Sequence, residues 1–222
     1  MINNYDKVAR YYDRLSRLVF FKSQVNAQIH QLSYLPEKGS VLIVGGGTGW
    51  ILEEIAKVRP EGLLLVYVEI SAKMIALSKK RDVGRNTVSF VNQSIEEFSS
   101  EMLFDVICTP FLFDNFSEQR AEMVFHHLDD TLKQEGLWFH TDFNSGGTAE
   151  DATAARGSWW KRLFLVVMYQ FFKIAGNVEA SKLINMGPYF VAADYKLLEE
   201  QYYYSRFIQS SVFQKQRKSE PI

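Results

Sequence analysis

Short apolar runs alternate with amphipathic segments along the chain from residue 41 to residue 143. The run Leu63–Val68 is apolar throughout, which is typical of a strand buried on both faces of a parallel sheet. The segments between the runs have the apolar spacing of helices. This strict alternation predicts a doubly wound, mostly parallel α/β sheet. The predicted strands lie at 41–44, 63–68, 88–91, 104–108 and 137–143.

The two ends of the chain have different patterns. Residues 5–35 repeat apolar side chains at helical spacing, and alternation over 195–214 predicts two further strands, which makes a sheet of seven. The predicted parts of one domain, 1–222, are a helical segment at 1–36, an α/β core at 37–143, a helical insertion at 144–194, a strand pair at 195–214 and a frayed tail at 215–222.

Charge and cysteine content exclude several classes of protein. The chain has 222 residues, of which 47% are hydrophobic, and a formal net charge of −1, so it lacks the basic excess of nucleic-acid-binding proteins. Cys108 is the only cysteine, which excludes an internal disulfide and fits a reducing compartment. The charges and tyrosines of residues 1–13 do not fit a signal peptide. We therefore expect a cytoplasmic protein that binds no nucleic acid.

The stretch VLIVGGGTGW, residues 41–50, predicts a strand that ends in a sharp turn. Its glycines have the spacing G-x-G-x-G at Gly45, Gly47 and Gly49, which differs from the G-x-G-x-x-G of dinucleotide-binding folds. Trp50 stands where those folds need a small residue for close packing of helix on strand. No Gly-Lys-Ser/Thr is present, which excludes a P-loop. The turn predicts close contact with an uncharged or zwitterionic ligand, and a tight turn without a ligand is the alternative.

Glu69 places a carboxylate at the end of the next predicted strand, twenty positions after Gly49. A carboxylate there can accept hydrogen bonds from both hydroxyls of a ribose. The alternative is that Glu69 caps the helix that begins near Ser71. The turn and the carboxylate together predict a nucleoside site.

These two motifs resemble those of the class I S-adenosylmethionine-dependent methyltransferases: VLIVGGGTGW is similar to the first motif and VYVEIS to the acidic second motif. The resemblance extends over about residues 1–143 and implies a Rossmann-like methyltransferase fold with S-adenosylmethionine as cofactor. The chain departs from the family pattern at Ile43, usually Asp or Glu, and at Ser94, usually Asp. The implied cofactor-binding residues are Tyr12, Gly45, Gly46, Gly47, Thr48, Gly49, Glu69, Ile70, Ser94, Ile95 and Thr109.

The stretch YDKVARYYD, residues 5–13, resembles the opening of quinone and related small-molecule methyltransferases. This resemblance implies that residues 1–36 form a helical lid, with Tyr12 over the cofactor and Tyr11 or Tyr5 nearby. The face of an aromatic ring attracts a cation such as a sulfonium. The alternative is that these tyrosines only pack a helix onto the domain, which we favour for Tyr5.

The end of the fourth predicted strand supplies candidates for the acceptor pocket. Thr109 and Phe111 follow that strand at the sheet edge where open α/β folds bind ligands, and Asp114 is a weaker candidate. A loop buried by its own phenylalanines is the alternative. The sequence Thr-Pro-Phe differs from the N-P-P-Y/F signature of methyltransferases that act on nucleic-acid amino groups, which further disfavours such a substrate.

His140 and Asp142 are two positions apart on the fifth predicted strand, so their side chains point to the same face. Asp142 lies near the carboxyl end of that strand and is a candidate general base. A capping role is the alternative. No spacing of histidines, cysteines and carboxylates indicates a metal site.

Residues 158–175 predict an apolar helix with a narrow basic side. Its apolar run, Leu163–Tyr169, is far shorter than the ~20 residues that span a bilayer. The helix is expected to form a pocket wall or cap, a homodimer face or a membrane-surface contact. Each of these makes the substrate pocket apolar and aromatic, and the candidate pocket residues are Tyr11, Phe111, Asp142 and Trp159.

The sequence thus predicts a methyltransferase that acts on a small or medium, largely apolar molecule by direct attack of a substrate O, C or N atom on the methyl group. Such chemistry depends mainly on positioning and on exclusion of water. One alternative is a cofactor-binding fold that no longer catalyses and acts through an apolar interface, for which Ile43 and Ser94 speak. The other is an NAD-dependent oxidoreductase, which Trp50 disfavours.

Overall fold

The computed structural model describes residues 23–144, 183–203 and 206–217. The strands are β1 (Gly39–Val44), β2 (Leu63–Val68), β3 (Thr87–Val91), β4 (Phe104–Pro110), β5 (Leu132–Phe143), β6 (Tyr195–Tyr203) and β7 (Ile208–Lys215). The helices are α2 (Ser23–Gln31), α3 (Trp50–Val58), α4 (Ala72–Ser78), α5 (Glu118–Thr131) and α8 (Gly187–Ala192), with 3-10 turns η1 (Leu32–Tyr34) and η2 (Phe113–Asn115).

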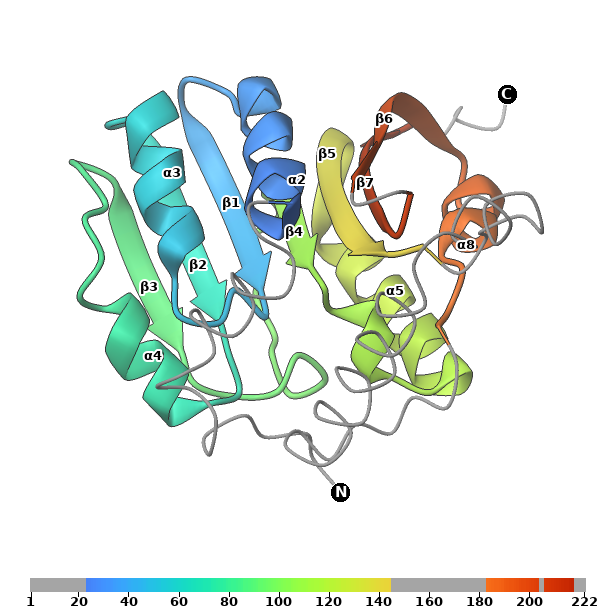
Figure 1. Cartoon of the computed structure of the whole chain (residues 1–222), viewed down its shortest axis with the longest axis horizontal. Helices are drawn as coiled ribbons and strands as arrows, with labels where there is room; N and C mark the ends of the chain where they lie inside the picture. The colour runs from blue at the N-terminus through green and yellow to red at the C-terminus, as the bar shows by residue number, and fades with distance from the viewer. Residues whose placement is uncertain (1–22, 145–182, 204–205, 218–222) are drawn as a thin grey trace, which may run out of the picture.

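The strands form one seven-stranded sheet in the order β3-β2-β1-β4-β5-β7-β6 (Figure 1). β1 to β5 are parallel, and β7 is antiparallel to both β5 and β6. The prediction of a doubly wound, mostly parallel seven-stranded sheet is therefore confirmed. The strand order reverses between β1 and β4, and open α/β sheets bind ligands at such a switch point, beyond the carboxyl ends of the strands.

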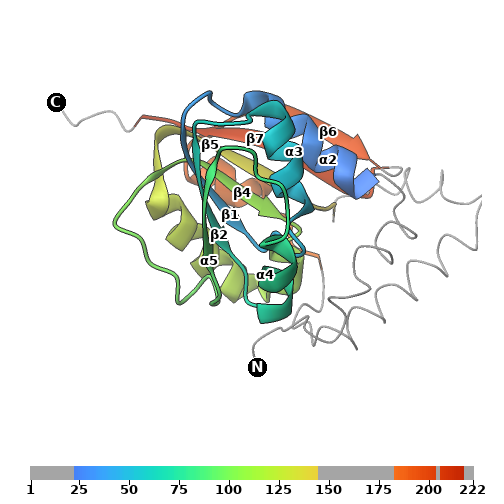
Figure 2. The same ribbon diagram turned by 90° about the vertical axis from the view of Figure 1, so that its left-hand side faces the viewer.

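The core has two layers because alternate residues of each strand face opposite sides of the sheet. Val41 and Ile43 of β1 pack with apolar residues of η1 and α3, whereas Leu42 and Val44 pack with α5 and α8. Figure 2 shows α2 and α3 on one face of the sheet and α5 on the other. Ile43, which stands in the place of an acidic residue, is fully buried in the first layer.

Several element ends differ from the prediction. β4 continues to Pro110, and β5 begins at Leu132, before the predicted start at Leu137. The pairing of β4 with β5 has a register shift, and Glu135 adopts a positive φ of 63°. Because the segment from Lys133 to Gly136 is polar, its pattern predicts the end of a helix and a turn, although the structure places it inside an irregular strand.

Lys215 was predicted to begin the frayed tail, but it is the last residue of β7 and so belongs to the sheet. Its Nζ lies 2.9 Å from a carboxylate oxygen of Asp129 and donates to the backbone oxygen of the same residue at 2.6 Å. Tyr195 also donates to this carboxylate, at 2.6 Å. This network joins β6 and β7 to α5. It therefore fixes Lys215, which lies one residue beyond the predicted strand pair.

Two predicted segments fall partly or wholly outside the described residues. In the predicted lid, α2 and η1 are helical, and residues 5–22 are not described. In the predicted insertion, α8 is described, and the helix expected at 158–175 is not. The boundaries and roles of the lid and the insertion remain predictions.

Candidate active site

The turn after β1 bends through glycines in the left-handed conformation. Gly45, Gly47 and Gly49 have φ values of 71°, 63° and 78°, which L side chains rarely adopt. Within the part of the chain that the structure describes, no atom lies within 4 Å of a Cβ atom placed on Gly47. The turn therefore leaves open space beside its backbone at Gly47, as a closely approaching ligand requires.

Tyr67 of β2 packs against this turn. Its hydroxyl donates to the backbone oxygen of Gly47 at 2.9 Å, and its ring is fully buried. A Cβ atom on Gly46 would lie 2.5 Å from the Tyr67 oxygen. Gly46 is therefore required for packing, in contrast to Gly47, which faces open space.

Arg81 fixes the next part of the turn. Its Nε donates to the backbone oxygen of Thr48 at 2.9 Å, and its Nη2 donates to the Thr48 hydroxyl at 3.2 Å. A Cβ atom on Gly49 would lie 2.4 Å from Cβ of Ser78, so the start of α3 packs closely on α4. Arg81 was not predicted, because it follows α4 in the sequence and nothing in the local pattern indicates a contact with the turn.

Glu69 is buried at the end of β2, with 6% of its surface exposed, and its carboxylate spans two backbone segments. One oxygen accepts from the N–H of Gly47 at 3.1 Å, and the other accepts from the N–H of Ser71 at 2.9 Å. Ser71 itself is the N-cap of α4, because its hydroxyl accepts from the N–H of Met74. A carboxylate at this place in the fold can accept hydrogen bonds from the hydroxyls of a ribose.

Asn92, just after β3, holds the backbone that carries Glu69. Its side-chain amide donates to the backbone oxygens of Glu69 and Ile70, each at 2.9 Å. Ser94 and Ile95 follow, and both side chains are largely buried, with Ile95 in the core. The structure thus brings the predicted ribose and adenine residues to neighbouring strand ends, and Asn92 is a further residue there that the sequence pattern did not indicate.

Thr109 at the end of β4 is a core residue. It is fully buried, and its hydroxyl accepts from the indole N–H of Trp138 at 2.9 Å. Its side chain therefore does not support the predicted role in cofactor binding. The prediction considered only the position of Thr109 at a strand end and not the partner that Trp138 on β5 provides.

Phe111 lies at the end of β4, where a pocket residue was predicted, and has a strained backbone. Its φ is 51°, which is uncommon for a residue other than glycine. The Phe111 N–H donates to the backbone oxygen of Thr141 at 2.7 Å, and its ring lies 5.0 Å from that of Phe143. Strained conformations of this kind are enriched at ligand sites, and Phe111 remains a candidate for the pocket.

Asp142 of β5 and Asp114 of η2 are neighbouring acids at the carboxyl ends of the strands. Asp142 is 5% exposed, and its oxygens accept from the N–H groups of Phe113 at 3.1 Å and Phe143 at 2.8 Å. Burial raises the pKa of Asp142 to about 7. Burial, together with the charge of Asp142, raises the pKa of Asp114 well above its usual range.

His140 lies beside these acids. Its ring is buried, with centroids 5.8 Å from Phe113 and 5.6 Å from Phe190, and burial lowers its pKa to about 4. The imidazole is therefore neutral at physiological pH, and its Nδ1 has no hydrogen-bond partner among the described residues. The predicted common face of His140 and Asp142 is seen in their shared neighbour, Phe113, which contacts both.

Leu112 connects the glycine turn with the acidic pair. A Cβ atom on Gly45 would lie 3.4 Å from Cδ1 of Leu112, and the next residue, Phe113, donates its N–H to Asp142. The turn after β1 and the acids after β4 and on β5 therefore lie side by side along the sheet edge.

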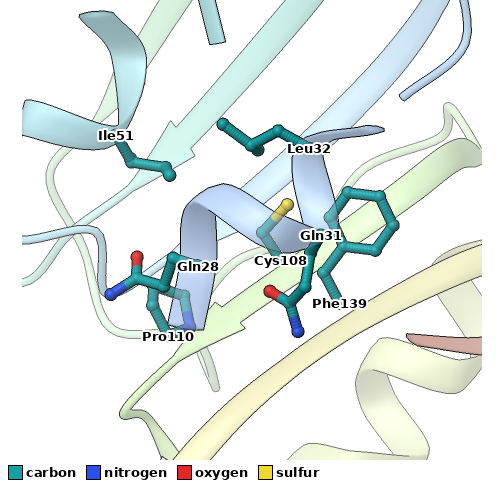
Figure 3. Close-up of a pocket in the computed structure, with 7 residues that line it drawn as sticks. All are labelled: Gln28, Gln31, Leu32, Ile51, Cys108, Pro110 and Phe139. Carbon is teal, nitrogen blue, oxygen red and sulfur yellow. The ribbon is translucent and has the colours of Figure 1, made fainter. Parts of the chain in front are cut away.

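A small pocket on the other face of β4 is lined by residues of α2, η1, α3 and the ends of β4 and β5 (Figure 3). Gln31 backs this pocket: its amide donates to the backbone oxygens of His140 and Ser211, and its oxygen accepts from Thr141. Burial raises the pKa of the Cys108 thiol in this pocket to about 12, so it is not a reactive thiolate at neutral pH. Gln31 thus fixes the end of β5 from the face opposite His140.

Three predicted site residues, Tyr11, Tyr12 and Trp159, lie outside the described residues, and so does the helix predicted at 158–175. Within the described ranges, no helix is long and apolar enough to cross a membrane.

Comparison with protein families finds a match between residues 41–136 and a family model described as a methyltransferase domain. The search of curated proteins finds no significant match. The matched residues run from β1 into β5 and include the glycine turn, Glu69 and the acid Asp114.

Solved structures share the fold over nearly the whole chain. A DhpI complex with S-adenosylhomocysteine has a TM-score of 0.68 and 14% identity, covering 96% of this chain and 94% of that one. A 1,6-didemethyltoxoflavin-N1-methyltransferase from Burkholderia thailandensis, with bound 1,6-didemethyltoxoflavin and S-adenosylhomocysteine, has a TM-score of 0.64 and 14% identity, covering 96% and 86%. The N-methyltransferase NodS from Bradyrhizobium japonicum WM9 has a TM-score of 0.59 and 15% identity, covering 89% and 97%.

Residues 41–136, less than half of the chain, therefore resemble a methyltransferase domain, and the solved structures share the fold of the chain. This match agrees with the resemblance of the glycine turn and the acidic motif to those of the class I S-adenosylmethionine-dependent methyltransferases.

Proposed function

We propose that this protein transfers the methyl group of S-adenosylmethionine to a small or medium, largely apolar acceptor. The observation that carries this proposal is the bond between Glu69 and the N–H of Gly47, which joins the acidic motif to the open part of the glycine turn. This arrangement places a carboxylate and exposed backbone side by side, at the switch point of the sheet.

The residues present fit the cofactor. The space beside Gly47 suits close approach of a ligand to backbone, and the position of the Glu69 carboxylate after β2 suits the two hydroxyls of a ribose. We propose that the Ser94 hydroxyl and the Ile95 N–H form hydrogen bonds with the adenine. We propose that Ile70 contacts the cofactor next to the adenine. The bound cofactor supplies an electrophilic methyl group, and this chain supplies position and exclusion of water.

The acceptor is proposed to bind beside Phe111 and Asp142, where the ends of β4 and β5 meet. A structurally similar methyltransferase has bound 1,6-didemethyltoxoflavin, which supports a small-molecule acceptor. We propose Asp142 as the group that removes a proton from the acceptor, since its raised pKa of about 7 suits a general base near neutral pH. Tyr11, Tyr12 and Trp159 remain our proposals for the rest of the pocket.

For the whole protein we propose a cytoplasmic location, with residues 158–175 as a pocket wall, a homodimer face or a membrane-surface contact. The near-zero net charge supports a partner other than nucleic acid.

Transfer of tritium from methyl-labelled S-adenosylmethionine tests this function. Purified protein is incubated with separated cell fractions, namely organic extract, protein and nucleic acid. We expect label in the organic extract and not in the macromolecules. Label only in protein or nucleic acid would contradict the proposed acceptor class, and label in no fraction, with cofactor bound, would favour the non-catalytic alternative.

A further inference from the structure

The segment at residues 94–98, the 94–98 turn, follows β3 and is closed by its own backbone. The N–H of Phe98 donates to the backbone oxygen of Ser94 at 3.2 Å and to that of Ile95 at 3.3 Å. Ser94 and Ile95 are the residues to which we assign the adenine of the cofactor. Because β3 is an edge strand, the sheet flanks this part of the chain on one side only. The geometry of the adenine site therefore depends on the contacts that hold the 94–98 turn.

Helix α5 holds the middle of the turn through Arg120. The Arg120 Nε donates to a carboxylate oxygen of Glu96, and the guanidinium carbon lies 4.6 Å from the centre of the Phe116 ring. The Arg120 side chain is 16% exposed, so the guanidinium is largely shielded from water. A planar guanidinium that lies over an aromatic ring has few orientations, and it can therefore keep Glu96 in one position.

His127 of α5 holds the end of the same turn. Its Nε2 lies 2.7 Å from the backbone oxygen of Phe98, and this nitrogen carries a proton and donates, because a carbonyl oxygen can only accept. Arg120 and His127 lie about two helical turns apart, so their side chains share one face of α5. One helix face thus binds the turn at two points, Glu96 and Phe98.

The apolar side chains of the turn pack in the core that α5 covers. Ile95 and Phe98 are each 5% exposed, and they belong to one core cluster with Ala121 and Val124 of α5. The helix therefore contributes both polar and apolar contacts to the position of the Ile95 backbone.

We propose that Arg120 and His127 are positioning residues that make the cofactor site selective for adenine. This inference rests on the proposed function and names the residues that hold its base-reading turn. Adenine has an acceptor at N1 and a donor in its 6-amino group, which match the Ile95 N–H and the Ser94 hydroxyl. Hypoxanthine has a donor at N1 and an acceptor at position 6, so a fixed Ile95 N–H disfavours it.

Selectivity for the base is separable from affinity for the whole cofactor. The other contacts that we propose lie on the glycine turn and at Glu69, and these do not read the base. A 94–98 turn that has lost a contact with α5 can shift and accommodate either base. Such a shift lowers the discrimination between bases, whereas a general loss of folded protein affects both ligands equally.

Calorimetry with S-adenosylhomocysteine and S-inosylhomocysteine tests the inference, since these ligands differ only in carrying adenine or hypoxanthine. We expect the wild type to bind the adenine ligand about tenfold more tightly or better. Arg120→Ala, Glu96→Ala and His127→Leu are each expected to reduce this ratio of affinities by about threefold or more. Glu96→Ala serves if a variant of α5 does not fold, because Glu96 lies outside any helix or strand.

Further variants separate positioning from a general effect on the fold. His127→Gln keeps a side-chain N–H donor and should retain more of the ratio than His127→Leu. The double variant Arg120→Ala/Glu96→Ala should reduce the ratio no more than either single variant, because each removes the same contact. Arg85→Ala, which removes the exposed ion pair with Glu61 at 2.6 Å, is the matched control and should leave the ratio unchanged.

The outcomes also distinguish the two proposals. A wild-type protein that binds both ligands equally, or an unchanged ratio in any of the three folded single variants, would overturn the positioning role and leave the proposed function intact. Failure of S-adenosylhomocysteine to bind the wild-type protein would instead contradict the proposed function.

Discussion

Gly46 and Gly47 are adjacent in the glycine turn but have opposite surroundings. Gly46 lies against the Tyr67 ring, and Gly47 faces open space with a left-handed backbone. A sequence motif treats these glycines alike, whereas the structure separates a packing glycine from a ligand-facing one.

Alanine at each position should therefore have a different effect. Gly46→Ala is expected to lower the free energy of unfolding by about 1–3 kcal/mol through overpacking against Tyr67. Gly47→Ala is expected to cost about 1 kcal/mol for its positive φ and to weaken S-adenosylhomocysteine binding tenfold or more, because the methyl group occupies the open space. Urea denaturation and calorimetry measure both effects. Wild-type affinity in Gly47→Ala would contradict the assignment of this space to the cofactor.

We expect His140 to make the free energy of unfolding depend on pH. Its pKa is lowered from 6.5 to about 4 in the folded protein, so between these values the unfolded chain binds a proton that the folded chain does not. Stability is then lost as the pH falls from 6.5 toward 4. The neighbouring carboxyls of Asp114 and Asp142 have raised pKa values, and their effect on stability has the opposite sign.

The His140→Phe variant isolates this contribution because it cannot bind the proton. We expect its stability relative to wild type to increase between pH 7 and pH 4.5, with a full effect on the order of 3 kcal/mol for a shift of this size. Urea denaturation at both pH values measures the difference. A difference that does not change with pH would contradict the lowered pKa of His140 in the folded protein.

Single-residue predictions from the sequence were strongest where a side chain marks a strand end. Glu69 and Asp142 lie at the ends of β2 and β5 as expected. Thr109 looked equivalent but is buried against Trp138, and Asn92 and Arg81 were missed. These contacts join side chains to segments distant in sequence, and no periodicity along the chain reveals such pairs.

The link between β2 and α4 is an element whose position decides the geometry of Glu69. Asn92 holds it through two carbonyl oxygens, and Ser71 caps the helix that follows. A Ser71 cap is the kind of feature that the sequence can predict, because capping is local. The Asn92 contact could not be predicted, because it requires the pairing of β2 with β3.

Asn92→Ala should loosen this link. Two hydrogen bonds of this type contribute about 1–3 kcal/mol together, so we expect a loss of stability in that range and a weakening of S-adenosylhomocysteine binding by roughly tenfold. Asn144→Ala, which removes an exposed amide bond to the backbone oxygen of Arg206, is the control. Equal loss of affinity in both variants would exclude a specific role for Asn92.

At the scale of the molecule, the sheet order brings together motifs that are far apart in sequence. The parallel strands β1, β2, β4 and β5 end at one edge, where the glycine turn, Glu69 and the acids meet. The alternation of strands and helices was enough to predict this edge, since connections between parallel strands are right-handed and regular. The irregular start of β5 was not predicted, because its segment from Lys133 to Gly136 is polar and has the composition of a turn.

The central claim is that the glycine turn and Glu69 hold the nucleoside of S-adenosylmethionine. Calorimetry of S-adenosylhomocysteine with wild type, Glu69→Gln and the exposed control Glu122→Gln tests it most directly. We expect wild type and Glu122→Gln to bind alike and Glu69→Gln to lose about 1–3 kcal/mol of binding free energy with the loss of the ribose hydrogen bonds. Unchanged affinity in a folded Glu69→Gln variant would contradict the claim.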